Sequence, residues 1–216
     1  MNRRGFFITF EGTEGSGKST QVKRLATFLR RQHWPVVATH EPGGTAFGRR
    51  VRQLVLNTPN LSLTPLEETC LFMASRAHLV AAIIHPALRR GQFVLCDRFL
   101  DATLAYQGGG SGVQLKLIRQ WGRVATQGLK PHLTFLLDIE TRKGLRRLRH
   151  QRDRMESKSL AYHRRVRQMY RRLAAAEPQR FVVLDATQPR TVLQRTIREH
   201  VLALSARVRR YGRRRR

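Results

Sequence analysis

The residues with the clearest chemical meaning form the pattern Gly12-x-x-x-x-Gly17-Lys18-Ser19, which follows the apolar run Phe6–Phe10. Glycines in such a loop let successive backbone N–H groups turn toward phosphates, and the N-terminus of the following helix adds its dipole. Lys18 can then reach the β- and γ-phosphates, and the Ser19 hydroxyl can bind Mg²⁺. A Gly/Ser-rich surface loop has a similar composition. The apolar run before the motif and the helical pattern after it favour a phosphate-binding loop.

Carboxylates follow two other apolar runs. Glu41 lies just after Val36–Thr39, and Asp97 comes directly after Phe93–Cys96. Apolar residues ending in Asp resemble the second magnesium motif of nucleotide triphosphate enzymes, whose carboxylate lies near the loop serine. Glu41 could help to hold the same ion through water. Asp138 is a rival for Asp97, but it opens directly into a helical pattern, where an acidic residue serves as a cap.

Two sets of arginines could bind nucleotide phosphates. Arg98 immediately follows Asp97 and suits an enzyme that clamps a second phosphate. Residues Arg142–Arg154 form a dense basic segment interrupted by Asp153 and followed by Glu156. By itself this segment is typical of a solvated helix face. Beside a phosphate loop, however, arginines on a mobile segment can fold over the γ-phosphate and exclude water.

The elements that must position these residues alternate along the chain. Strands are predicted at Phe6–Phe10, Val36–Thr39, Phe93–Cys96, Leu133–Leu137 and Phe181–Leu184. Helical patterns are predicted around residues 18–32, 45–56, 64–90, 111–127, 141–150, 159–176 and 189–207. This alternation predicts an α/β fold with a mostly parallel sheet covered on both faces. Ligands should gather at the carboxyl ends of its strands.

The charge of the chain is unusually positive. It has 42 Lys and Arg residues against 14 acidic ones, for a net charge of +28. The C-terminal stretch Arg207–Arg216 concentrates the arginines. Such a balance could serve nucleic-acid binding. The alternative is a compositional bias that fills solvated faces with arginine, which the even spread of basic residues along the helices favours. Either would give non-specific adhesion to nucleic acid.

Length and composition predict one globular domain of 216 residues, 41% of them apolar. No apolar run approaches the ~20 residues of a membrane span, and no signal-peptide pattern begins the chain. Cys70 and Cys96 lie in apolar segments and are expected to be buried free thiols in a reducing cytoplasm. We expect a domain over residues 1–210 and a basic, disordered tail at 211–216.

Six motifs occur together and in a fixed order. They are Phe-Glu-Gly-Thr-Glu-Gly-Ser-Gly-Lys-Ser-Thr from Phe10, His-Glu-Pro-Gly-Gly-Thr from His40, Phe-Met-Ala-Ser-Arg-Ala-His-Leu-Val from Phe72, Asp-Arg-Phe from Asp97, Ala-Tyr-Gln-Gly from Ala105 and Asp-Ala-Thr-Gln-Pro from Asp185. From about Phe6 to Leu204 the chain therefore resembles the bacterial thymidylate kinases, which phosphorylate dTMP to dTDP with ATP. The resemblance implies a P-loop nucleoside monophosphate kinase fold with a five-stranded parallel sheet and a short arginine-rich lid at about residues 149–158.

The resemblance also implies binding roles for particular residues. The phosphates of ATP would be bound by Gly12, Thr13, Glu14, Gly15, Ser16, Gly17, Lys18, Ser19 and Thr20. The substrate dTMP would be bound by Glu14, Arg52, Phe72, Arg76, Arg98, Thr103, Tyr106 and Gln107. Among these, Glu14 would contact the 3′-hydroxyl, Phe72 would stack on thymine, and Tyr106 would disfavour a ribose 2′-hydroxyl. Mg²⁺ would be held by Ser19 and Asp97, with Glu41 through water. The loop Asp185–Pro189 would lie near adenine.

Catalysis would depend on Lys18, Asp97, Arg98 and arginines of the lid. Some family members carry a catalytic arginine in the phosphate loop and others in the lid. This loop has none, so the chain resembles the lid-arginine type, with Arg149, Arg152 and Arg154 competing for the role. The family usually forms homodimers in the cytoplasm, without a membrane.

Two other functions fit parts of the sequence. A kinase for another nucleoside monophosphate or a deoxynucleoside would share the phosphate loop, although Phe72, Arg76 and Gln107 argue against it. A nucleic-acid-binding P-loop ATPase would use the positive charge, but no arrangement of aromatic residues for base stacking supports it.

Overall fold

A parallel β-sheet forms the centre of the molecule. In the computed structural model, which describes residues 5–58, 60–148 and 153–213, the sheet has five strands in the order β2-β3-β1-β4-β5. Every neighbouring pair is parallel. The strands are β1 (Phe6–Glu11), β2 (Val36–His40), β3 (Phe93–Asp97), β4 (Leu133–Asp138) and β5 (Phe181–Asp185). The predicted fold class and all five strands are confirmed, each strand extending one residue further than its predicted run.

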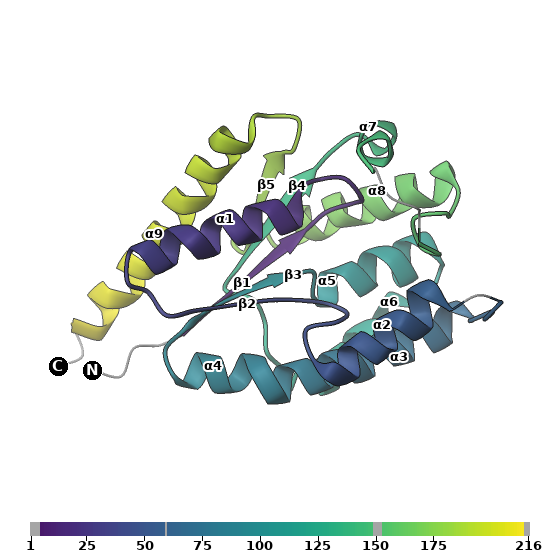
Figure 1. Cartoon of the computed structure of the whole chain (residues 1–216), viewed down its shortest axis with the longest axis horizontal. Coiled ribbons are helices and arrows are strands. Elements are labelled where there is room, and N and C mark those ends of the chain that lie inside the picture. The colour runs from purple at the N-terminus through teal and green to yellow at the C-terminus, as the bar shows by residue number, and fades with distance from the viewer. Residues whose placement is uncertain (1–4, 59, 149–152, 214–216) are drawn as a thin grey trace.

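Helices cover both faces of this sheet (Figure 1). They are α1 (Lys18–Arg31), α2 (Ala46–Asn57), α3 (Pro65–Leu79), α4 (His85–Arg89), α5 (Leu100–Thr103), α6 (Leu115–Ala125), α7 (Thr141–Arg146), α8 (Leu160–Ala176) and α9 (Arg190–Arg213). Alternate residues of β1 point to opposite faces. Ile8 packs in the core with α1 and α9, whereas Phe7 packs with α3 and α4.

The strand register brings the polar strand ends together. Phe10 of β1 pairs with Asp97 of β3, and Glu11 pairs with Leu136 of β4. At the far edge Asp138 pairs with Asp185. The loop after β1 is therefore flanked by the ends of β3 and β4, as expected for a ligand site in a parallel α/β sheet.

Two helical regions in the middle of the chain differ from the sequence prediction. The predicted helix 64–90 is continuous but changes to π-helical geometry over Val80–Ile84. Residues 100–110, for which no helix was predicted, form α5 and a π-helical segment, Leu104–Gly110. Its glycines are typical of a loop, but here they allow close packing. A Cβ on Gly110 would lie 2.5 Å from the Tyr162 ring of α8.

Helix Pro65–Arg89 also has the length and mean hydropathy (1.4) of a membrane span, contrary to the sequence estimate. Length and composition alone are weak evidence, because a core helix of a globular domain passes the same test. Its residues Phe72, Met73, Leu79 and Ile84 pack into clusters with other elements of the domain. We therefore describe it as a core helix.

The last helix, α9, runs to Arg213, beyond the predicted end at 207 and into the stretch from Tyr211 that was expected to be disordered. Arginine is a good helix former, so the basic run can continue the preceding helical pattern. The boundary of the predicted tail is therefore wrong at residues 211–213, and the remaining three residues lie outside the described structure.

The acidic residues are distributed very differently from the basic ones. Of the 14 acidic side chains, five are buried. The buried ones are Glu11, Glu14, Glu41, Glu68 and Asp101. Only Glu67, Asp185 and Glu199 are classed as exposed. Most of these buried carboxylates lie at or near the carboxyl ends of the strands, where the candidate site is found.

Candidate active site

The loop between β1 and α1 has the backbone of a phosphate-binding loop. Gly12 and Gly15 have φ values of 140° and 65°, which side-chain-bearing residues rarely adopt. A Cβ on Gly12 would lie 2.4 Å from the carbonyl oxygen of Leu137 on β4, so the close approach of the loop to the sheet also requires glycine. Helix α1 then begins at Lys18, and its free N–H groups face the loop.

Lys18 lies inside this loop. Its Nζ donates hydrogen bonds to the carbonyl oxygens of Gly12 (3.0 Å) and Thr13 (2.9 Å). Burial and the nearby positive charge of Arg98 lower the pKa of Lys18 to about 8. The ammonium group is thus held by loop carbonyls, in a place where an anionic phosphate would favour its charged form.

Ser19 and Asp97 are in direct contact. The Ser19 hydroxyl donates a hydrogen bond to Oδ2 of Asp97. The rival carboxylate, Asp138, instead accepts hydrogen bonds from Nε (2.7 Å) and Nη2 (2.9 Å) of Arg167. Among the described residues no group of three or more His, Cys, Asp or Glu side chains could hold a metal ion. One hydroxyl and one carboxylate fit Mg²⁺, which takes its other ligands from phosphates and water.

Glu41 lies beside Asp97, with its backbone N–H 2.9 Å from the Asp97 carbonyl oxygen, but its carboxylate pairs with another residue. Its Oε2 accepts a hydrogen bond from Nε of Arg76 at 2.7 Å, and both side chains are almost fully buried. Burial raises the pKa of Glu41 to about 7, although the charge of Arg76 works against this. A water-mediated contact of Glu41 with Mg²⁺ stays a prediction.

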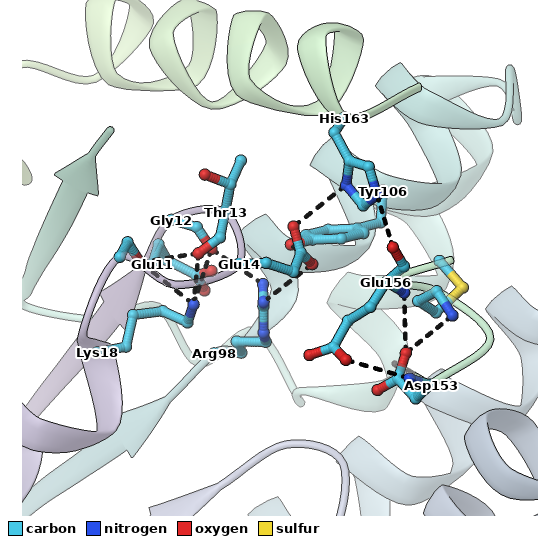
Figure 2. Close-up of polar contacts among 12 residues, drawn as sticks. Glu11, Gly12, Thr13, Glu14, Lys18, Arg98, Tyr106, Asp153, Glu156 and His163 are labelled. Atoms are coloured by element: carbon cyan, nitrogen blue, oxygen red, sulfur yellow. Dashed lines mark hydrogen bonds and ion pairs between the residues drawn. The ribbon is translucent and has the colours of Figure 1, made fainter. Parts of the chain in front are cut away.

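Arg98 lies between the phosphate loop and Tyr106. Its Nη1 donates to the carbonyl of Gly12 (3.2 Å), its Nη2 lies 3.6 Å from Oε1 of Glu14, and its guanidinium carbon is 4.7 Å from the centre of the Tyr106 ring (Figure 2). Burial alone would lower the pKa of Arg98, but the hydroxyls and carboxylates around it raise it well above its usual value. Arg98 is therefore a fixed cation at the mouth of the loop.

Glu14 is the polar centre of the adjacent contacts (Figure 2). The Tyr106 hydroxyl donates to its Oε1 at 2.5 Å, and Nδ1 of His163 lies 3.2 Å from its Oε2. Burial works against ionisation, but the contact with His163 and the charge of Arg98 lower the pKa of Glu14 to about 2. His163 had no predicted role. Its own Nε2 lies 3.3 Å from the carbonyl of Glu156.

A cavity of about 140 Å³ opens beside the phosphate loop. All eight predicted substrate-binding residues line it: Glu14, Arg52, Phe72, Arg76, Arg98, Thr103, Tyr106 and Gln107. They come from the phosphate loop, α2, α3, the end of β3 and the helical segment 100–110. The structure thus brings together residues that are far apart in the sequence. The cavity is also lined by Asp153, Met155 and Glu156 of the predicted lid.

Two polar side chains of this cavity are held in place by neighbouring groups. Arg76 donates from Nη2 to the Phe99 carbonyl (3.0 Å) and to Oγ1 of Thr103 (3.1 Å). Gln107 donates from Nε2 to Oε2 of Glu68 at 3.0 Å. Sequence reasoning missed Glu68, which is 2% exposed. Its only sequence signal was its place in an apolar helix one turn before Phe72.

The described part of the lid packs on α2 and α3. Nε of Arg154 donates to the carbonyl of Val55 at 2.8 Å, and Nη2 lies 2.9 Å from Oε1 of Glu68. Asp153 accepts from the backbone N–H groups of Met155 and Glu156, both at 2.9 Å (Figure 2). Arg154 therefore contacts Glu68, the side chain that holds Gln107 of the cavity. The other lid candidates, Arg149 and Arg152, lie outside the described residues.

Comparisons with known proteins agree with this geometry. A family model for thymidylate kinase matches residues 10–197. This chain belongs to the thymidylate kinase family. The thymidylate kinase of Deinococcus radiodurans is 52% identical over 196 residues, covering 90% of this chain and 95% of that protein. The thymidylate kinase of Desulfovibrio desulfuricans is 47% identical, covering 85% and 88%. A crystal structure of thymidylate kinase from Ehrlichia chaffeensis matches with a TM-score of 0.71 and 34% identity, covering 84% and 93%.

One more arginine of this thymidylate kinase family member contacts the phosphate loop. Arg147, just after α7, donates from Nη1 to the carbonyls of Ala186 (3.0 Å) and Gly15 (3.5 Å). It therefore joins the loop expected near adenine, Asp185–Pro189, to the phosphate loop. The sequence marked Arg147 only as part of a basic segment and gave no reason to separate it from its neighbours.

Proposed function

We propose that this protein transfers the γ-phosphoryl group of ATP to the 5′-phosphate of dTMP, which yields ADP and dTDP for dTTP synthesis. Membership of the thymidylate kinase family supports the reaction. The observation that carries the assignment of residues is the cavity beside the phosphate loop, because all eight predicted substrate residues line it. Its position would place a monophosphate next to the triphosphate site, as a direct transfer requires.

On the ATP side, the loop amides and Lys18 bind the β- and γ-phosphates. Ser19 and Asp97 would hold Mg²⁺, which would supply charge neutralisation and orient the phosphates when bound. The ammonium of Lys18 can exchange the carbonyl oxygens of Gly12 and Thr13 for phosphate oxygens, because an anionic acceptor binds an ammonium group more strongly than a neutral carbonyl does. Arg147 reaches the same loop from α7.

On the dTMP side, Arg98 and Arg52 hold the 5′-phosphate. Phe72 stacks on thymine, which Arg76, Gln107 and Thr103 recognise at its polar edge. Glu14 accepts a hydrogen bond from the 3′-hydroxyl, because a carboxylate whose pKa is about 2 stays ionised at neutral pH. Tyr106, held by Glu14, crowds the 2′ position and so disfavours ribonucleotides.

The decisive test is ATP-to-ADP conversion with a panel of dTMP, dUMP, dCMP and UMP. We expect turnover with dTMP to exceed that with the other three by about tenfold or more. The base of dUMP and UMP lacks the methyl group of thymine, dCMP presents a different polar edge, and UMP also carries a 2′-hydroxyl. Preference for another nucleotide would overturn the substrate assignment. ADP formation stimulated by DNA or RNA without dTMP would favour the nucleic-acid-binding ATPase.

The wider setting is also a proposal. The protein is expected to be a cytoplasmic homodimer, as the family usually is, and sedimentation velocity tests the dimer. The net charge of +28 supports loose, sequence-independent adhesion to nucleic acid. Such adhesion should weaken steeply between about 50 and 200 mM salt.

A further inference from the structure

Glu11 is a buried carboxylate that the proposed reaction does not use. Glu11 ends β1, directly before the phosphate loop, and is fully buried, with 0% exposure. Its two oxygens have different partners. Oε1 accepts the backbone N–H of Phe99 at 2.7 Å, and Oε2 accepts the hydroxyl of Tyr170 at 2.8 Å. Both partners are next to Arg98. Phe99 follows it in the chain, and the Tyr170 hydroxyl contacts its side chain.

The first contact fixes the backbone of Arg98. Arg98 has a φ of 71°, in the left-handed region where a residue other than glycine is strained. Such a conformation persists only when surrounding contacts enforce it. On one side the N–H of Arg98 donates to the Phe10 carbonyl at 3.0 Å. On the other, Glu11 holds the N–H of the next residue, Phe99. Glu11 thus secures the turn that directs Arg98 toward the phosphate loop.

The second contact reaches the guanidinium of Arg98. The Tyr170 hydroxyl, on α8, donates to Glu11 and accepts from Nη1 of Arg98 at 3.2 Å. Tyr170 is 1% exposed, so water does not compete for this hydroxyl. A carboxylate, a hydroxyl and a guanidinium therefore form a continuous chain of hydrogen bonds. Such chains are stronger in a buried, low-dielectric environment than in water.

We propose that Glu11 is a positioning residue that holds Arg98, by its backbone and through Tyr170, in the orientation that binds the 5′-phosphate of dTMP. The inference rests on the proposed role of Arg98. In this role Glu11 contacts neither nucleotide.

The electrostatics of Glu11 fit a role other than stabilising the fold. Burial and the nearby Asp101 carboxylate raise the pKa of Glu11 to about 8, against the charge of Arg98 and the two hydrogen bonds. Asp101 itself is held by Arg180, from Nη1 at 2.6 Å. Because the same carboxyl group ionises freely in the unfolded chain, its burial at this position costs the folded protein free energy at neutral pH. A residue retained only for packing would more simply be apolar.

The test compares dTMP with thymidine, which lacks the phosphate, in Glu11→Gln and Tyr170→Phe. Isothermal titration calorimetry of the full chain gives the dissociation constant of each ligand. We expect dTMP to bind about tenfold or more weakly in either variant, the usual effect of losing a hydrogen bond to a charged group. Thymidine affinity should change less than about threefold. Tyr162→Phe is the matched control, because Tyr162 is another buried tyrosine of α8 and its hydroxyl donates to the Tyr106 carbonyl at 3.2 Å.

The outcomes separate this inference from the proposed function. Equal losses for dTMP and thymidine, or no loss for dTMP, would overturn the role of Glu11. Arg98→Ala is the reference. If it also fails to discriminate between the two ligands, the phosphate-clamp role of Arg98 is wrong. If it discriminates and the other variants do not, only the inference about Glu11 fails. Should Glu11→Gln not fold, Tyr170→Phe decides, since it removes only one hydroxyl.

Discussion

Nδ1 of His163 lies 3.2 Å from Oε2 of Glu14, so helix α8 contacts the phosphate loop through two buried side chains. The other ring nitrogen of His163 faces the carbonyl of Glu156 in the lid. The His163 side chain is fully buried, so it links these two segments away from water. The phosphate loop, α8 and the described part of the lid therefore share one buried contact.

The carboxyl of Glu14 should make stability depend on pH. Its pKa falls from 4.5 in the unfolded chain to about 2 in the fold, so it stabilises the fold above pH 4.5 and loses this effect as the pH falls toward 2. We expect the difference in unfolding free energy between the parent and Glu14→Gln to shrink by about 3 kcal/mol from pH 6 to pH 2. Urea titrations at several pH values measure it. Parallel curves for the two proteins would contradict the prediction.

Replacing Lys18 should separate activity from stability. Lys18→Ala is expected to lower kcat about a hundredfold or more, because it removes charge that balances the transferring phosphoryl group. The unfolding free energy at pH 7 should not fall. Burial lowers the pKa of Lys18 to about 8, so its charged form is costly in the fold. Lys23→Ala, exposed on the same helix, is the control. Turnover within tenfold of the parent would exclude Gly12–Ser19 as the ATP phosphate site.

The base pocket should respond to Gln107→Ala with a selective loss of dTMP. The side chain is 1% exposed, and its removal leaves both thymine and Glu68 with an unpaired polar group. We expect the KM for dTMP to rise about tenfold while that for ATP stays within about twofold. Arg76→Ala should act in the same direction, but it also leaves Glu41 buried without its cation. Equal loss for both nucleotides would mean that the thymine site is elsewhere.

Two roles of Arg154 can be distinguished: catalysis from the lid, and holding Glu68 in place. If Arg154 mainly holds Glu68, and through it Gln107, Arg154→Ala should raise the KM for dTMP. In a Glu68→Gln background the same substitution should then raise this KM little further. A double-mutant cycle in kcat and KM measures this. A large kcat loss that persists in the Glu68→Gln background would instead support the original prediction that Arg154 neutralises the transferring phosphoryl group.

Much of the fold and site could be predicted because the signals are local. The run Phe6–Phe10, the glycines at 12 and 17 and Lys18 form one contiguous strand–loop–helix pattern. The substrate residues were carried over from a resemblance to short motifs. Their common cavity then arises because parallel strands place their carboxyl ends at one edge.

The residues that were missed depend on contacts between distant segments. Glu11 lies in a pattern that explains it as the end of a strand, and its pairing with Tyr170 requires α8 to pack behind the loop. Glu68 resembles a polar residue on a helix until Gln107 and Arg154 are placed around it. The helical segment 100–110 was missed for a different reason. Its glycines are loop formers in general, and only close packing against α8 makes them necessary here.

The chain has 42 basic and 14 acidic residues, and five of the acidic side chains are buried, so positive charge predominates on the outer surface. Both nucleotides are anions, so this field would attract them before any contact forms and raise their rate of encounter with the protein. The attraction is screened over about 10 Å at 0.1 M salt. Most of the five buried carboxylates lie at or near the strand ends, beside the candidate site and not on the outer surface. Substrate capture by this kinase should consequently be more sensitive to ionic strength than the transfer step that follows it.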